Sequence, residues 1–215
     1  MARHFLITSL LLLSFGLKAQ NSWSPKGFGS FTPKRTECVS PQQRLEIESL
    51  LSNNITTLKK EGKLPANWGS EKLKTTSGNF IWPLQQQSGF NYNSIYGISN
   101  FVDHNAFYPN ALLDWNCGNR TYDLSNGYNH AGIDIFLWPF SQTMQNAQQA
   151  AIIAASQGVI IAKTDGNFDH NCSLGSGTWN AVYIGNPDGT ICWYGHMKDG
   201  STTSKIVGQT VAQGE

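Results

Sequence analysis

The chain from Phe80 onward is divided into short apolar runs separated by turns rich in glycine, asparagine and proline. Such runs, including Phe80–Leu84, are typical of β-strands and too short for helices. We expect one hairpin between runs 151–155 and 159–162, and another between runs 181–184 and 190–194 through an Asn-Pro-Asp-Gly turn. The pattern predicts a mainly β (α+β) fold with an antiparallel sheet as its core and an N-terminal helical extension.

One longer periodic segment precedes these runs. Ser40 can cap a helix, Pro41 suits its first turn, and Gln43 completes a capping box. Apolar residues follow at helical spacing: Ile47, Leu50, Leu51, Ile55 and Leu58. Gly62 and Pro65 end the pattern. We expect a helix of about five turns that packs against the main domain or belongs to a propeptide-like segment.

Charge is scarce in this chain and excludes some classes of protein. Only 13% of the residues are charged, compared with about 25% in an average soluble domain. The net charge of +1 argues against a nucleic-acid partner, which requires a basic surface to displace counterions. An aromatic content of 12% argues against intrinsic disorder. The composition is typical of an exported, β-rich protein.

The first twenty residues have the pattern of a secretory signal peptide. Arg3 precedes an apolar run over residues 5–17, and the small residue Ala19 offers a cleavage site near Ala19/Gln20. The run is shorter than the roughly 20 residues that a membrane-spanning helix needs, and no second hydrophobic span follows. An N-terminal anchor or a buried helix is the alternative. We expect a secreted, periplasmic or cell-envelope protein.

Three regions are therefore expected. Residues 1–20 form the signal peptide, residues 21–79 an N-terminal extension with one long helix, and residues 80–215 the main domain. Whether the extension is an inhibitory propeptide is left open by the sequence.

The cysteines favour disulfide bonds in an oxidising compartment. Cys38, Cys117, Cys172 and Cys192 are widely spaced, without the Cys-x-x-Cys pairs of zinc fingers. Four cysteines allow three connectivities, and the sequence does not choose among them; the preferred pair is Cys117–Cys172, because both residues lie in loops near the candidate site. Free, buried thiols are the alternative.

The motif most suggestive of chemistry joins His130 and Asp134. Side chains four residues apart lie on the same face of a strand, and Gly132 between them leaves room for a shared ligand. Zinc accepts both imidazole and carboxylate ligands. A His-x-x-x-Asp pair by itself is nevertheless more often an ordinary surface pair than a metal site.

A second motif is Trp193-Tyr194-Gly195-His196-Met197. If this segment is a strand, Cys192, Tyr194 and His196 share one face, which places the histidine at a strand end beside an aromatic ring. A hydrogen-bonded histidine at the end of a strand is the simpler interpretation of this motif alone.

The order of these motifs carries more information than any one of them. His130-Ala-Gly-Ile-Asp134 is followed by Ala154-Ala-Ser-Gln-Gly158, the hairpin turn at Asp188-Gly189, the His196 motif and Val207–Glu215. Over residues 126–215 this succession resembles the lysostaphin-type zinc endopeptidases, the group that includes β-lytic metallopeptidase.

The resemblance implies an antiparallel β metallopeptidase core with one zinc ion as cofactor. It further implies that His130 and Asp134 are two of three zinc ligands and that His196 assists catalysis by hydrogen bonding to the attacking water or the oxyanion. The implied function is a secreted zinc metalloendopeptidase, and the implied substrates are the peptides of peptidoglycan.

One part of the family pattern is absent. The third zinc ligand of the family belongs to a His-x-His motif after the turn matched by Val207–Glu215, and this sequence contains no His-x-His. His170 is a possible substitute, although a solvated loop histidine is its more usual role. Because catalytic zinc sites usually have three protein ligands, we expect a fragment of a longer enzyme with weak zinc binding and little hydrolysis. The alternative is a truncated, inactive relative.

Two further functions remain open. One is a non-catalytic, peptidase-like module that binds peptidoglycan or activates another cell-wall hydrolase. The other is a carbohydrate-binding β-domain, suggested only by the abundance of tryptophan and tyrosine. Trp115, Trp179 and Trp193 are expected in the core rather than in a sugar-binding surface.

Overall fold

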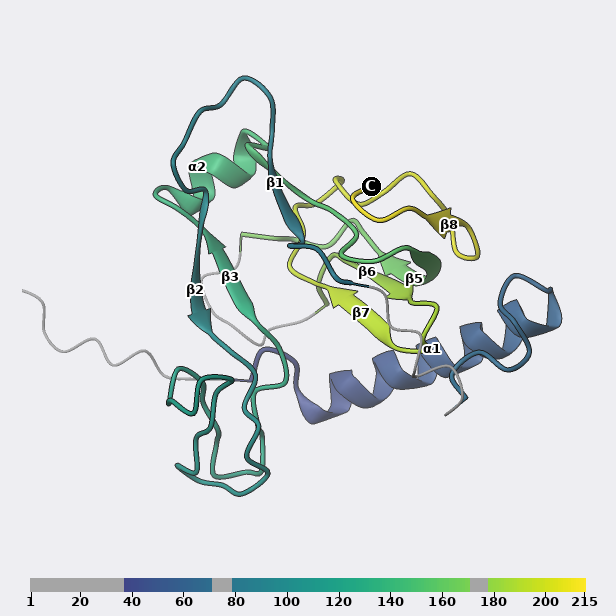
Figure 1. Cartoon of the computed structure of the whole chain (residues 1–215), viewed down its shortest axis with the longest axis horizontal. Coiled ribbons are helices and arrows are strands. Elements are labelled where there is room, and N and C mark those ends of the chain that lie inside the picture. The colour runs from purple at the N-terminus through teal and green to yellow at the C-terminus, as the bar shows by residue number, and fades with distance from the viewer. Residues whose placement is uncertain (1–36, 71–78, 171–177) are drawn as a thin grey trace, which may run out of the picture. The chain divides into compact units, whose positions relative to one another are not determined.

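The computed structural model describes residues 37–70, 79–170 and 178–215. In these residues the chain forms a mixed α+β structure with an N-terminal helix and short strands (Figure 1). The elements are α1 (Pro41–Lys60), β1 (Leu84–Gln86), β2 (Tyr96–Asn100), β3 (Asp134–Leu137), α2 (Ser141–Asn146), β4 (Ala150–Ile152), β5 (Gly158–Thr164), β6 (Ala181–Gly185), β7 (Ile191–Tyr194) and β8 (Thr210–Val211).

The described strands form three small sheets, and each strand pair in them is antiparallel. β1 pairs with β4, β2 pairs with β3, and the largest sheet has the order β7-β6-β5-β8. The expected α+β fold with antiparallel sheets and an N-terminal helix is therefore confirmed.

The hairpin of β6 and β7 agrees with the sequence analysis. Its turn is closed by hydrogen bonds from the Asn186 N–H to the Thr190 carbonyl, at 2.8 Å, and from the Gly189 N–H to the Asn186 carbonyl, at 3.0 Å. Gly189 has a φ of +87°, and a Cβ at this position would lie 2.5 Å from the Cα of Gly69. Only glycine fits this turn without strain.

The other expected hairpin is wrong. Residues 150–152 pair with β1, whereas β5 pairs with β6 and β8. The backbone of Ala155 is engaged elsewhere: its N–H donates to the Tyr194 hydroxyl at 2.8 Å, and its carbonyl accepts from the Ile81 N–H at 2.9 Å. Segments distant in sequence thus supply the hydrogen bonds that a local hairpin would have supplied.

Helix α1 begins where the sequence predicts. The Ser40 hydroxyl accepts a hydrogen bond from the Gln43 N–H at 3.2 Å, and Pro41 occupies the first turn. The buried side chains of the helix are Ile47, Leu51 and Leu58. Near its end, the Lys59 ammonium donates to the Trp68 carbonyl at 2.8 Å, so the helix and the segment after it are joined.

Strand β5 lies at the centre of the hydrophobic core. Ile160 and Ile161 are both fully buried, in two different clusters. The Ile161 cluster includes side chains from both α1 and β6, namely Ile47, Leu51, Leu58, Ala181 and Tyr183. Helix α1 therefore packs against the sheet, one of the two roles expected for it.

The expected signal peptide at residues 1–20 lies outside the described residues. The expected domain boundary at residue 79 stays a prediction, since residues 71–78 also lie outside them. Neither described helix combines the length and the apolar character needed to cross a membrane.

Candidate metal centre

His130 and Asp134 meet, although not within one strand. β3 begins only at Asp134, and the chain bends at Gly132 before it. The His130 Nε2 atom nonetheless lies 3.1 Å from Asp134 Oδ1. A Cβ added at Gly132 would meet no atom within 4 Å, so this side of the bend is open, as the sequence analysis expected.

Backbone hydrogen bonds hold His130 in place. Its N–H donates to the Tyr122 carbonyl at 3.1 Å, and its carbonyl accepts from the Asp103 N–H at 2.7 Å. The imidazole is 2% exposed and stacks on the Tyr122 ring, with 4.6 Å between ring centroids. Such a confined ring has little rotational freedom.

The second ring nitrogen of His130 also has a partner. Nδ1 lies 2.7 Å from the Phe101 carbonyl oxygen, which can only accept, so Nδ1 carries a proton and donates it. This is the outer-shell arrangement that orients metal-binding histidines. It leaves Nε2 as the atom that binds either a proton or a metal ion.

Asp134 is oriented from the neighbouring strand. The Asn100 side-chain amide donates to Asp134 Oδ2 at 2.9 Å, and the two residues are paired in the β2–β3 ladder. Oδ1 is the oxygen that faces His130. In each residue of the predicted pair, a hydrogen bond to one polar atom of the side chain thus orients the other polar atom, His130 Nε2 or Asp134 Oδ1, toward its partner.

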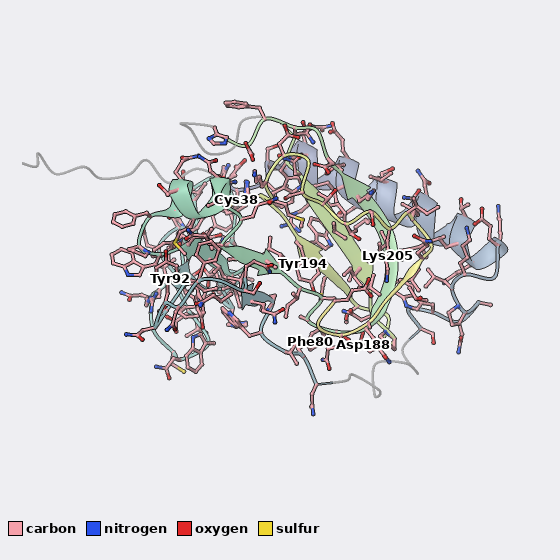
Figure 2. The ribbon with its side chains drawn as sticks, turned by 90° about the horizontal axis from the view of Figure 1, so that it is seen from above. Cys38, Phe80, Tyr92, Asp188, Tyr194 and Lys205 are labelled. Atoms are coloured by element: carbon pink, nitrogen blue, oxygen red, sulfur yellow. The ribbon has the colours of Figure 1, made fainter. Side chains whose placement is uncertain are left out.

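The structure adds Cys38, which the sequence analysis did not assign to the site. Its Sγ atom lies 3.8 Å from Asp134 Oδ1 and 3.2 Å from the Tyr122 hydroxyl oxygen. The ligand atoms of Cys38, His130 and Asp134 all lie within 4.8 Å of one another, and the three residues could hold a metal ion. Cys38 is 96 residues from Asp134 in sequence, and no local motif links them. Figure 2 labels Cys38 among the side chains.

The ionisation of the predicted pair reflects its burial and its mutual contact. Burial lowers the pKa of His130, but the hydrogen bond with Asp134 and the contacts with Cys38 and the Phe101 carbonyl raise it to about 10. Burial raises the pKa of Asp134, but the contacts with His130, Asn100 and Cys38 together outweigh this and lower it overall. Without a metal the two residues form an ion pair at neutral pH.

His196 follows strand β7 instead of continuing it. β7 ends at Tyr194, and His196 has a φ of 55°. The imidazole packs edge-on against the Trp179 ring, with 4.8 Å between centroids. Loss of hydration lowers the pKa of His196, while the charge of Asp134 opposes this shift.

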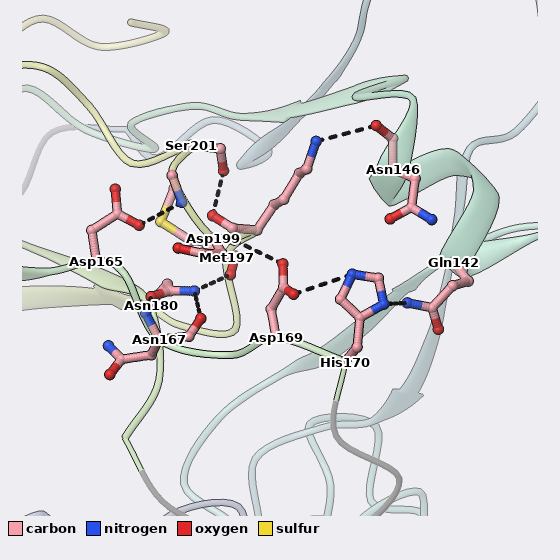
Figure 3. A network of polar contacts seen from close by, with 12 residues as sticks. Gln142, Asn146, Asp165, Asn167, Asp169, His170, Asn180, Met197, Asp199 and Ser201 are labelled. Atoms are coloured by element: carbon pink, nitrogen blue, oxygen red, sulfur yellow. Dashed lines mark hydrogen bonds and ion pairs between the residues drawn. The ribbon is translucent and has the colours of Figure 1, made fainter.

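A polar network fixes the loop that carries His196 (Figure 3). The Met197 N–H donates to the Asn180 carbonyl at 3.0 Å, and the Asn180 side-chain amide donates to the Met197 carbonyl at 3.2 Å. Further along, Asp165 accepts from the Gly200 N–H at 2.9 Å. These contacts tie residues 197–200 to the start of β6 and the end of β5.

His170 belongs to the same network and not to the metal group of the described residues. Its Nε2 lies 3.2 Å from Asp169 Oδ1, and its Nδ1 lies 2.5 Å from the Gln142 amide nitrogen (Figure 3). Asp169 in turn accepts from the Asp199 N–H at 2.7 Å. The structure therefore gives His170 partners in the loop network.

The expected disulfides stay untested. Cys38, Cys117 and Cys192 are free thiols. Cys172 lies outside the described residues, so the preferred Cys117–Cys172 pair lies outside them as well.

Three tryptophans were expected in the core. Trp179 and Trp193 pack against it, whereas Trp115 is 66% exposed, so the expectation was wrong for Trp115. Trp115 instead stands edge-on to Phe101, with 5.9 Å between centroids.

Comparison of the chain with protein-family models, with curated proteins and with solved structures gives no significant match in any of the three.

Replacing Gly195 by alanine is expected to destabilise the protein by about 1–3 kcal/mol. The new Cβ would lie 2.5 Å from the Trp179 ring, so the ring that supports His196 has to move. Urea unfolding measures the loss. Gly132→Ala is the matched control, because its Cβ meets nothing within 4 Å. Equal stability of the two variants would contradict the close packing.

Proposed function

We propose that this protein is a secreted zinc metalloendopeptidase that hydrolyses peptide bonds in peptidoglycan. The observation that carries the proposal is the contact between His130 and Asp134, with each residue oriented from behind by a second hydrogen bond. The motif order described above supplies the reaction class and the substrate class. Export through the expected signal peptide would bring the protein to the cell envelope.

The donor atoms fit zinc better than the hard cations. Magnesium and calcium prefer oxygen ligands throughout, whereas zinc accepts nitrogen, sulfur and oxygen together. The group of Cys38, His130 and Asp134 offers one atom of each kind. When bound, zinc would supply a Lewis acid that polarises the scissile carbonyl and lowers the pKa of water.

The residues of the chain would bind the metal and hydrogen bond to the substrate. His130 and Asp134 would hold the metal. His196 has a lowered pKa, so its imidazole is neutral at neutral pH and acts through a ring N–H that donates to the substrate carbonyl oxygen. This agrees with the hydrogen-bonding role that the family resemblance implies for His196. The network at residues 197–200 keeps the His196 loop in one position.

Digestion of purified peptidoglycan tests the proposal. The sequence alone predicted little hydrolysis because it offered two zinc ligands; with the three-residue group as the zinc site, the zinc-loaded chain is expected to release new amino termini. Chelation of zinc or the His196→Ala substitution is expected to lower the rate by about 100-fold or more. His104→Ala is the control, because His104 is an exposed histidine outside the metal group. Zinc-loaded protein that sediments with peptidoglycan but releases no new termini would instead support the non-catalytic binding module.

A further inference from the structure

Cys38 occupies a segment that is anchored on each side of it. Before it, Glu37 accepts a hydrogen bond from the side-chain amide of Asn126. After it, the Val39 side chain is buried in the core cluster of α1 and β5, and Ser40 caps α1. The position of the thiol is therefore determined by its neighbours in the chain.

The Cys38 side chain packs against the hydrophobic core cluster and also has polar contacts. Its Sγ atom touches the Tyr122 hydroxyl and the Asp134 carboxylate, at 3.2 and 3.8 Å. A cysteine that acts as a small hydrophobe would be enclosed by apolar side chains. Besides its apolar packing, Cys38 has the contacts of a sulfur atom that takes part in a polar site.

The same atoms meet the requirements of a metal ligand. The Sγ atom belongs to a group whose three ligand atoms lie within 4.8 Å of one another. Tyr122 contacts both Sγ and the His130 ring, so it orients two members of the group. Thiolate sulfur is among the preferred ligands of zinc.

We propose that Cys38 is the third protein ligand of the zinc ion, bound as a thiolate whose proton is released to solvent. The proposal rests on the zinc site of the proposed function and adds the ligand that the sequence analysis found missing. It gives the described residues three protein ligands, the number usual in catalytic zinc sites. It also requires that Cys38 remain a free thiol in the active protein.

Metal binding by the full chain tests this ligand directly. Cys38→Ala is expected to weaken zinc binding by about 100- to 1,000-fold, in proportion to the loss of one ligand. With cobalt(II) as a probe, the wild-type protein is expected to show sulfur-to-metal charge-transfer absorption that the variant lacks. Cys117→Ser, which changes an exposed free thiol outside the group, is the control and retains both properties.

A measurement on the wild-type chain covers the case in which Cys38→Ala does not fold. Zinc is expected to protect Cys38 from alkylation by iodoacetamide, with the modified cysteine identified by mass spectrometry. Unchanged zinc affinity in folded Cys38→Ala, or alkylation of Cys38 at the same rate with and without zinc, would overturn the proposal.

These outcomes are separate from those of the peptidase assay. Thiolate–cobalt absorption without any hydrolysis would leave Cys38 a ligand and contradict the endopeptidase. Zinc-dependent hydrolysis by a Cys38→Ala variant of undiminished zinc affinity would keep the endopeptidase and remove Cys38 from the site.

Discussion

Replacing His130 by glutamine is expected to lower the zinc affinity of the protein by about 100- to 1,000-fold. Zinc sites with four protein ligands bind with about 10–16 kcal/mol, so one ligand contributes about 3 kcal/mol. His130 is also the most constrained member of the group, at 2% exposure and with both ring nitrogens engaged. Glutamine can still donate to the Phe101 carbonyl but offers no imidazole nitrogen to the metal.

Competition with a chromophoric chelator measures this loss. His104→Gln is the matched control, since it makes the same change at an exposed histidine outside the metal group. Circular dichroism of both variants confirms that the fold is kept. Wild-type zinc affinity in His130→Gln would show that the buried imidazole serves packing alone and would remove the metal centre from the proposed function.

Zinc affinity is also expected to rise by about 100-fold or more between roughly pH 6.5 and 8.5. The direction of this change follows from the ion pair between His130 and Asp134. The pKa of His130 is raised to about 10 in the metal-free protein, so throughout this range zinc must displace a proton from Nε2. The displaced His130 proton alone changes the affinity about tenfold per unit of pH, and the proton that Cys38 releases when it binds as a thiolate makes the rise steeper. Asp134, whose pKa is lowered, is already ionised and adds no pH dependence in this range.

Chelator competition at several pH values gives the slope, and the NMR titration of the metal-free protein gives its cause. The His130 ring is expected to stay protonated through this pH range in the wild-type protein. In Asp134→Asn it is expected to titrate much lower, because the partner that holds the proton is lost. A flat affinity profile, or a wild-type His130 that titrates at the ordinary value, would contradict the buried ion pair.

The sequence predicted correctly the structural elements that a single short segment determines. Helix α1 follows from Ser40, Pro41 and the apolar spacing after them, and the β6–β7 hairpin follows from its turn residues. The pairing of His130 with Asp134 was anticipated for a partly wrong reason, because a bend at Gly132 and not a continuous strand brings them together.

Longer-range contacts were not predictable in the same way. Ala155 looked like part of a local hairpin, but it uses its backbone groups on Ile81 and Tyr194. Cys38 reaches the metal group across 96 residues because the start of α1 is fixed beside it, and no spacing rule connects such distant positions. Both depend on how elements pack, which hydrophobic periodicity does not specify.

The packing of α1 on β5 bears on how such a protein could mature. Ile47, Leu51 and Leu58 share one core cluster with Ile161 and Tyr183. A protease that removed the whole extension through residue 79 would uncover this apolar surface and take Cys38 away with it. Any processing that preserved both the core and the proposed ligand set would therefore have to cut upstream of Cys38 and leave α1 attached.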